Sequence, residues 1–167
     1  MVLGLSLAAF TGLHVILSLV GILAGLMVAF AMLQAKQPPR LSALFLLTTA
    51  LTDMTGFLFP MPFDPAFAVG IIDLVAVAVA CLALYVSHLN GAARWVYVVG
   101  GLLALYFNCF VLVAQGFQKV AFLHQYAPTG KEPAFAAAQG VLLVLFLGFG
   151  VAAVRKFHPM SPAPAIA

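Results

Sequence analysis

Residues 13–34 read LHVILSLVGILAGLMVAFAMLQ and contain no Asp, Glu, Lys or Arg. A helix needs about 20 consecutive, mainly apolar residues to cross the hydrocarbon core of a bilayer. This stretch therefore has the length and apolarity of a membrane-spanning helix. No Lys or Arg precedes it and no clear cleavage site leads into a soluble chain, so we expect it to be retained and not removed as a signal peptide.

The composition of the whole chain agrees with this interpretation. Of its 167 residues, 65% are hydrophobic and 7% are charged, whereas soluble domains carry about 25% charged residues. A soluble fold of this size leaves too much surface exposed to hide so many apolar side chains. A disordered chain and a disulfide scaffold are excluded as well, and the scattered basic residues argue against nucleic-acid binding. We therefore predict an integral membrane protein.

Four further segments match the first in length and apolarity. The five predicted transmembrane helices cover residues 13–34, 41–59, 67–89, 95–118 and 134–154. They are separated by turn-forming residues, and they are too long and too continuously apolar for the strands of a membrane barrel. The predicted fold is all-α, a single integral membrane helical bundle over residues 1–157. A flexible, Pro-rich tail over residues 158–167 is expected to follow it.

The placement of Lys and Arg predicts the orientation, because cytoplasmic loops carry an excess of both. If the five helices alternate in direction, the basic residues divide five to two, with Lys36, Arg40, Arg94, Arg155 and Lys156 on one side and Lys119 and Lys131 on the other. The N-terminus is therefore expected outside the cell and the C-terminus in the cytoplasm. At the inner end of the fourth helix, Trp95 and Tyr97 are expected to join an interfacial aromatic belt.

Three ionisable residues, His14, Asp53 and Asp73, fall inside the predicted spans. An ionised side chain in a bilayer costs about 2.5–3.5 kcal/mol on insertion scales, and such residues usually face the bundle interior. By the rise of a helix, both Asp residues lie roughly 10 Å below the outer ends of their helices. Each would be protonated, paired with Lys119 or His14, or bound to a cation.

The fourth predicted helix adds polar residues to the same outer half. Asn108, Gln115 and Lys119 share one face of this helix at about 100° per residue. Together with the three ionisable residues they give a candidate ligand or proton site of His14, Asp53, Asp73, Asn108, Gln115 and Lys119. The alternative is structural, because Asn and Gln in membrane helices usually form interhelical hydrogen bonds and Lys can extend to the interface. On the first helix, Gly21 and Gly25 form a GxxxG pattern that favours close helix packing.

No sequence motif in the chain points to catalysis. HExxH, phosphate-binding and dinucleotide-binding patterns are missing, so no catalytic residue and no metal site are predicted, and an enzyme is disfavoured. Haem ligated by two histidines would need them at matching depth. His14 and His124 are both near the outer side, but His124 lies beyond the end of the fourth predicted helix, and His88 is on the inner side. Haem, or a quinone in the same outer pocket, is therefore a minor alternative.

Several stretches resemble a family of small, polytopic bacterial inner-membrane proteins that has no established activity. They are LFLLTTALTDMTGFLFP at 44–60, GIID at 70–73, RWVYVV at 94–99, YFNCFVLVAQGFQK at 106–119 and APTGKEPAF at 127–135. The resemblance covers residues 13–157 and implies a multi-pass protein of the bacterial inner membrane. Small polar residues are more usual in that family at the positions of Asp53 and Asp73, so it implies no function for this pair.

Three functions follow from the sequence, in decreasing order of support. The first is a subunit, accessory or scaffold protein that packs its helices against other membrane subunits or against a second copy. The second is a small carrier or proton-coupled protein that uses the outer polar pocket. The third is a membrane redox protein that holds haem or a quinone there.

Overall fold

The computed structural model describes residues 2–59 and 65–158, and over these ranges it is helical and has no β-strand. The helices are α1 (Leu7–Leu33), α2 (Pro39–Gly56), α3 (Pro65–Cys81), a π-helical turn η1 (Leu82–Val86), α4 (Ala93–Lys119), α5 (Ala121–His124) and α6 (Pro133–Lys156). The predicted all-α bundle is confirmed. The loop at residues 60–64 and all but the first residue of the expected tail at 158–167 lie outside the described ranges.

The helix ends differ from the prediction where local capping decides them. Helix α1 begins at Leu7, six residues earlier than predicted, because the Ser6 side chain accepts a hydrogen bond from the Ala9 amide at 3.2 Å and caps the first turn. Pro39 and Pro133 occupy first-turn positions of α2 and α6, where the missing amide hydrogen costs nothing. The one-turn helix α5 and the π-helical turn η1 were not predicted.

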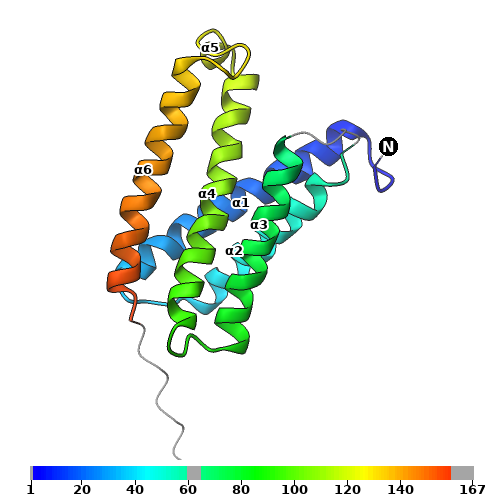
Figure 1. Ribbon diagram of the computed structural model, residues 1–167. Helices are drawn as coiled ribbons and strands as arrows, with labels where there is room; N and C mark the ends of the chain where they lie inside the picture. The colour runs from blue at the N-terminus through cyan, green and yellow to red at the C-terminus, as the bar shows by residue number, and fades with distance from the viewer. Residues whose placement is uncertain (1, 60–64, 159–167) are drawn as a thin grey trace, which may run out of the picture.

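Helix α4 lies at the centre of the bundle and contacts every other helix. In Figure 1, α3, α4 and α6 run roughly upright, whereas α1 crosses behind α4 at an angle and α2 packs antiparallel to α1. Helix α6 contacts only α4 and α1 among the described helices. The basic loops α1–α2 and η1–α4 and the C-terminal end of α6 gather at the lower end, and α5 caps the upper end.

Helix α1 packs closely against α2 and α4 at the GxxxG pattern. A Cβ atom on Gly21 would lie 3.1 Å from Thr48 Oγ1, and one on Gly25 would lie 2.7 Å from side-chain atoms of Leu105 and Phe45. Only glycine fits at the second position without displacing its neighbours. Gly21 and Gly25 therefore set how closely α1 approaches α2 and α4.

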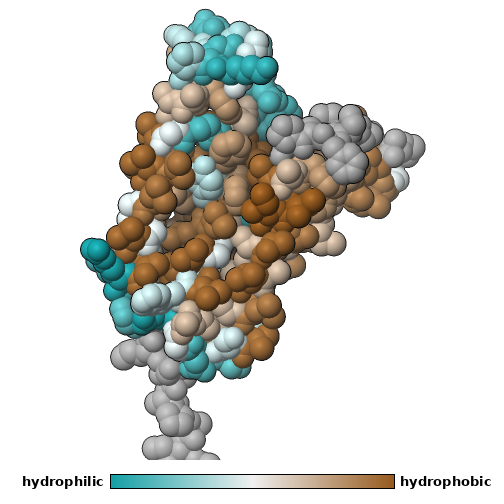
Figure 2. Space-filling view, viewed as in Figure 1, coloured by the Kyte–Doolittle hydropathy of each residue, from teal (hydrophilic) through white to brown (hydrophobic). Residues whose placement is uncertain are grey.

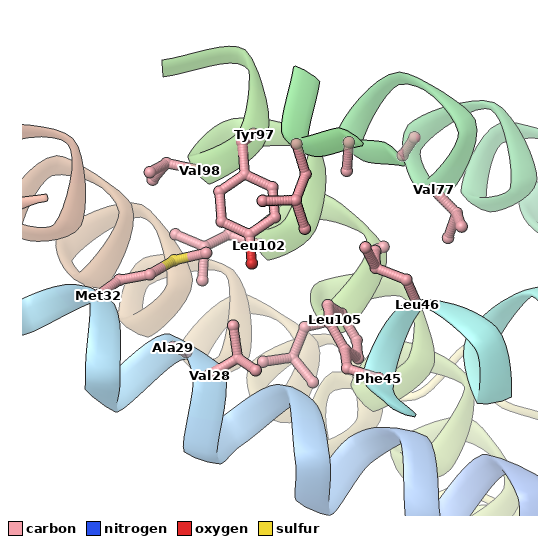
Figure 3. Close-up of a cluster of buried hydrophobic side chains, with 14 of the residues drawn as sticks. Val28, Ala29, Met32, Phe45, Leu46, Val77, Tyr97, Val98, Leu102 and Leu105 are labelled. Carbon is pink, nitrogen blue, oxygen red and sulfur yellow. The ribbon is translucent and has the colours of Figure 1, made fainter. Parts of the chain in front are cut away.

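The apolar core fills the lower half of the bundle, where α1, α2, α3 and α4 converge (Figure 3). The ring of Tyr97 projects into this core, and its side chain is 1% exposed. Its hydroxyl donates a hydrogen bond to Ser42 Oγ at 3.0 Å, which satisfies the polar end of the ring. The prediction that Tyr97 joins an aromatic belt was therefore wrong, whereas Trp95 is exposed and lies beneath the Arg94 guanidinium.

Four helices are long and apolar enough to cross a membrane, namely α1, the continuous α3–η1 helix (from residue 67), α4 and α6. Helix α2, which is 18 residues long, is not among them, because it carries four Thr, one Ser, one Asp and one Arg. Most of these polar side chains are buried inside the bundle. Figure 2 shows hydrophobic residues across the middle of the molecule and hydrophilic ones gathered at its two ends.

Candidate functional site

Asp53 on α2 and Asp73 on α3 come together inside the bundle. Their side chains are 8% and 3% exposed, and their carboxyl groups lie close enough to interact directly. The two helices run in opposite directions, so residues at similar distances from the loop that joins them meet at the same level. The sequence placed both residues in one layer, and the structure brings them into direct contact.

Asn108 on α4 is the third member of this cluster. Its amide Nδ2 donates to Asp73 Oδ2 at 3.0 Å and to the backbone carbonyl of Ala104 at 3.1 Å, so both of its hydrogens are used. The bond to Ala104 fixes the amide on its own helix. Asn108 therefore presents a fixed donor to Asp73, and three different helices meet at one polar point.

The remaining oxygens of the pair lack donors. Asp53 Oδ2 and Asp73 Oδ1 are buried and accept no hydrogen bond from a donor group of the protein. Within residues 2–59 and 65–158, no Lys, Arg or His forms an ion pair with either carboxyl group. Two carboxylates in contact without a cation cannot both be ionised. A proton on one carboxyl group would let it donate a hydrogen bond to the other.

His14 lies next to this cluster and does not join it. Its Nδ1 is 2.9 Å from Thr55 Oγ1, and its ring packs edge-on against Phe59. The Thr55 hydroxyl donates its only hydrogen to the Leu51 carbonyl at 2.7 Å. We therefore assign the Nδ1 hydrogen to His14 as the donor to Thr55, which leaves Nε2 free to accept a proton.

Gln115 and Lys119 do not reach the carboxyl pair. Gln115 is half-buried and Lys119 is exposed, and neither has a hydrogen bond or ion pair with another described residue. Lys119 is close enough to act electrostatically on His14. The expected pairing of Lys119 with the carboxyl groups is thus not observed in the described structure. Of the six candidate residues, Asp53, Asp73 and Asn108 form one cluster, Lys119 acts electrostatically on His14 away from it, and Gln115 belongs to neither.

A second buried polar group was not predicted as a site. Ser42 accepts hydrogen bonds from Tyr97 and from the side-chain amide of Gln37, at 3.0 and 3.3 Å. Tyr97 precedes Asn108 by eleven residues, which puts both on the same helical face at about 100° per residue, and this spacing could have revealed the contact. The group ties the start of α2 to α4.

No group of three or more His, Cys, Asp or Glu residues that could hold a metal occurs among the described residues. His124, one of the two histidines considered for haem, has its Nδ1 3.2 Å from the Phe117 carbonyl. Comparisons with protein-family models, with curated proteins and with solved structures find no match to this chain. The chemistry of the carboxyl cluster therefore has to be argued from its own geometry.

Proposed function

We propose that this chain is a multi-pass membrane protein in which the Asp53–Asp73 pair takes up and releases a proton. One observation carries the proposal: two buried carboxyl groups from different helices lie against each other, and no Lys, Arg or His of the described residues is paired with either. Ionisable residues inside membrane bundles are costly and are typical of proton relays and transport sites. The corresponding class is a small carrier or other proton-coupled membrane protein, not an enzyme.

The distribution of polarity supports a transmembrane placement. Four helices have the length and apolarity of membrane spans, and α2, 18 residues long, turns its polar residues inward. We propose that α2 is the fifth span, with the N-terminus outside and the basic, lower end of the bundle in the cytoplasm. The resemblance described above favours the bacterial inner membrane.

The shared proton gives the pair a means of coupling protonation to helix position. With one proton, the carboxyl groups attract each other and hold α2 against α3. Removal of that proton leaves two negative charges in contact in a region of low dielectric, where their repulsion is strong. The state in which α2 and α3 separate is then favoured, so uptake and release of the proton shift the population of the two arrangements.

Infrared spectroscopy of the protein in lipid vesicles tests this proposal directly. We expect a carboxylic-acid C=O band at neutral pH whose frequency shifts in Asp53→Asn and in Asp73→Asn, because either substitution replaces one of the two interacting carboxyl groups by an amide. Glu132→Gln, which changes an exposed loop carboxyl group, is the control and should leave the band unchanged. A wild-type spectrum that shows only carboxylate bands at neutral pH would contradict the proposal.

A second function, as a subunit or scaffold component, is favoured by the exposure of α6. Only 11% of the 18-residue apolar stretch of this helix is buried. Side chains such as Val141, Val144 and Leu145 are 61–68% exposed. Another membrane subunit or a second copy could cover this face. Extraction in mild detergent followed by mass measurement distinguishes the cases, since a stable monomer would count against this function.

A further inference from the structure

A groove lined mainly by apolar side chains runs between α4 and α6 and shares no residue with the carboxyl cluster. Its volume is about 430 Å³, which is within the usual range of roughly 300–1,000 Å³ for small-molecule sites. Its walls include Leu102 and Tyr106 on α4 and Leu143 and Leu147 on α6. Arg155, at the lower end, is the only charged residue that lines it.

The length of the groove matches one leaflet of a bilayer. Along α6 it extends from Leu143 to Arg155, which corresponds to roughly 18 Å at 1.5 Å per residue. The hydrocarbon core of a bilayer is about 30 Å thick, so one leaflet contributes roughly 15 Å. An acyl chain that enters beside Arg155 would therefore lie in the groove over the depth of that leaflet.

Arg155 is available to bind an anion at the open end. Its side chain is exposed, and it has no hydrogen bond or ion pair with any other described residue. A guanidinium group matches the geometry of a phosphate and can donate two parallel hydrogen bonds to it. Basic residues between transmembrane helices at the cytoplasmic side are suited to anionic lipid headgroups.

We propose that this groove binds one anionic phospholipid of the inner leaflet, with an acyl chain between α4 and α6 and its phosphate on Arg155. The proposal rests on the transmembrane orientation given under Proposed function, but not on the Asp53–Asp73 pair. An acyl chain gains little by moving from lipid into an apolar groove. Selectivity for the bound lipid therefore comes from the charge at Arg155.

Native mass spectrometry of the detergent-solubilised protein, titrated with dioleoyl phosphatidylglycerol or dioleoyl phosphatidylcholine, tests the charge requirement. We expect one phosphatidylglycerol to be retained in preference to phosphatidylcholine. Arg155→Gln should weaken retention about fivefold, the effect of one basic residue near an anionic headgroup. Lys156→Gln is the matched control, because it removes the same charge from the adjacent residue, which does not line the groove.

A second pair of variants tests the position of the acyl chain. A Cβ atom on Gly150 would point toward Leu102 at 3.8 Å, so Gly150→Leu places a side chain in the groove, whereas Gly148 has nothing within 4 Å and does not line it. We expect Gly150→Leu to abolish retention and Gly148→Leu to preserve it. Circular dichroism is the folding control, and we expect both variants to have the helical content of the wild-type protein.

Three outcomes would overturn the proposal. Equal losses in Arg155→Gln and Lys156→Gln would indicate a general attraction of basic residues for lipid. Equal retention of phosphatidylcholine would remove the role of charge. A dimer that is disrupted by Gly150→Leu but not by added phosphatidylglycerol would show that a second copy of the chain occupies the groove. Each outcome leaves the infrared test of the carboxyl pair unaffected, so failures of the two proposals can be distinguished.

Discussion

Asn108 connects the carboxyl pair to α4 through a single hydrogen bond to Asp73. Replacement by Ala leaves Asp73 Oδ2 without this donor inside the bundle, and a lost hydrogen bond of this kind costs about 1 kcal/mol. We expect Asn108→Ala to lower the free energy of unfolding by about that amount in mixed micelles. Gln115→Ala is the control on the same helix, because Gln115 has no hydrogen bond to lose. Equal effects of the two substitutions would contradict this role for Asn108.

Glu132 orders the loop before α6 through its ionised carboxyl group. It accepts hydrogen bonds from the Thr129 hydroxyl at 2.8 Å and from the amides of Thr129 and Lys131 at 3.1 and 3.0 Å. Desolvation acts to raise the pKa of Glu132, but these hydrogen bonds outweigh it and hold the pKa below its ordinary value.

A lowered pKa in the folded state means that the ionised form stabilises the loop. This contribution is fully present above the ordinary pKa of a Glu side chain, and it is lost as the pH falls through the lowered value. We expect amide hydrogen exchange at Thr129 and Lys131 to accelerate over that acidic range. Glu132→Gln should remove the pH-dependent step, and a step that persists in this variant would assign it to another group.

The helices themselves could be predicted from the length of their apolar segments, but two elements could not. The turn η1 and the one-turn helix α5 lack any periodic signal, because both are shorter than two helical turns.

The carboxyl cluster was predicted in part. Asp53 and Asp73 meet because α2 and α3 are antiparallel neighbours and the two residues lie at similar distances from the loop that joins these helices. Gln115 and Lys119 share a face with Asn108, but they lie roughly 10 and 16 Å farther along the axis. A shared face does not imply a shared depth.

Close packing of α1 predicts a strong dependence on residue size at Gly25. In Gly25→Ala the new Cβ atom would be 2.7 Å from side-chain atoms of Leu105 and Phe45, so these side chains or the helices that carry them must move, at a cost of about 1–3 kcal/mol. Gly12, on the same helix, has nothing within 4 Å, and Gly12→Ala should be neutral or stabilising by up to about 1 kcal/mol. Thermal unfolding in detergent compares the two. A stable Gly25→Ala variant would show that α1 and α2 do not pack in this way.

For the whole molecule, the proposed orientation predicts which loops face each side of the membrane. Single cysteines at Gln37 and Thr129, in a background with Cys81 and Cys109 replaced by Ala, report the lower and upper ends of the bundle. We expect a membrane-impermeant maleimide to label Thr129→Cys in intact cells, and Gln37→Cys only after the membrane is opened. Labelling of both from outside would refute five alternating spans.

The inward polarity of α2 has a consequence for how the chain is assembled after synthesis. Thr48 and Thr49 face Gly21 of α1, so this part of the polar side of α2, which is unfavourable in lipid, is covered when α1 lies beside it. A segment that is too polar to move by itself from the translocation machinery into the bilayer can enter the bilayer as one half of a helical hairpin. We therefore expect α1 and α2 to partition into the bilayer together, with the first helix acting as an intramolecular chaperone for the second.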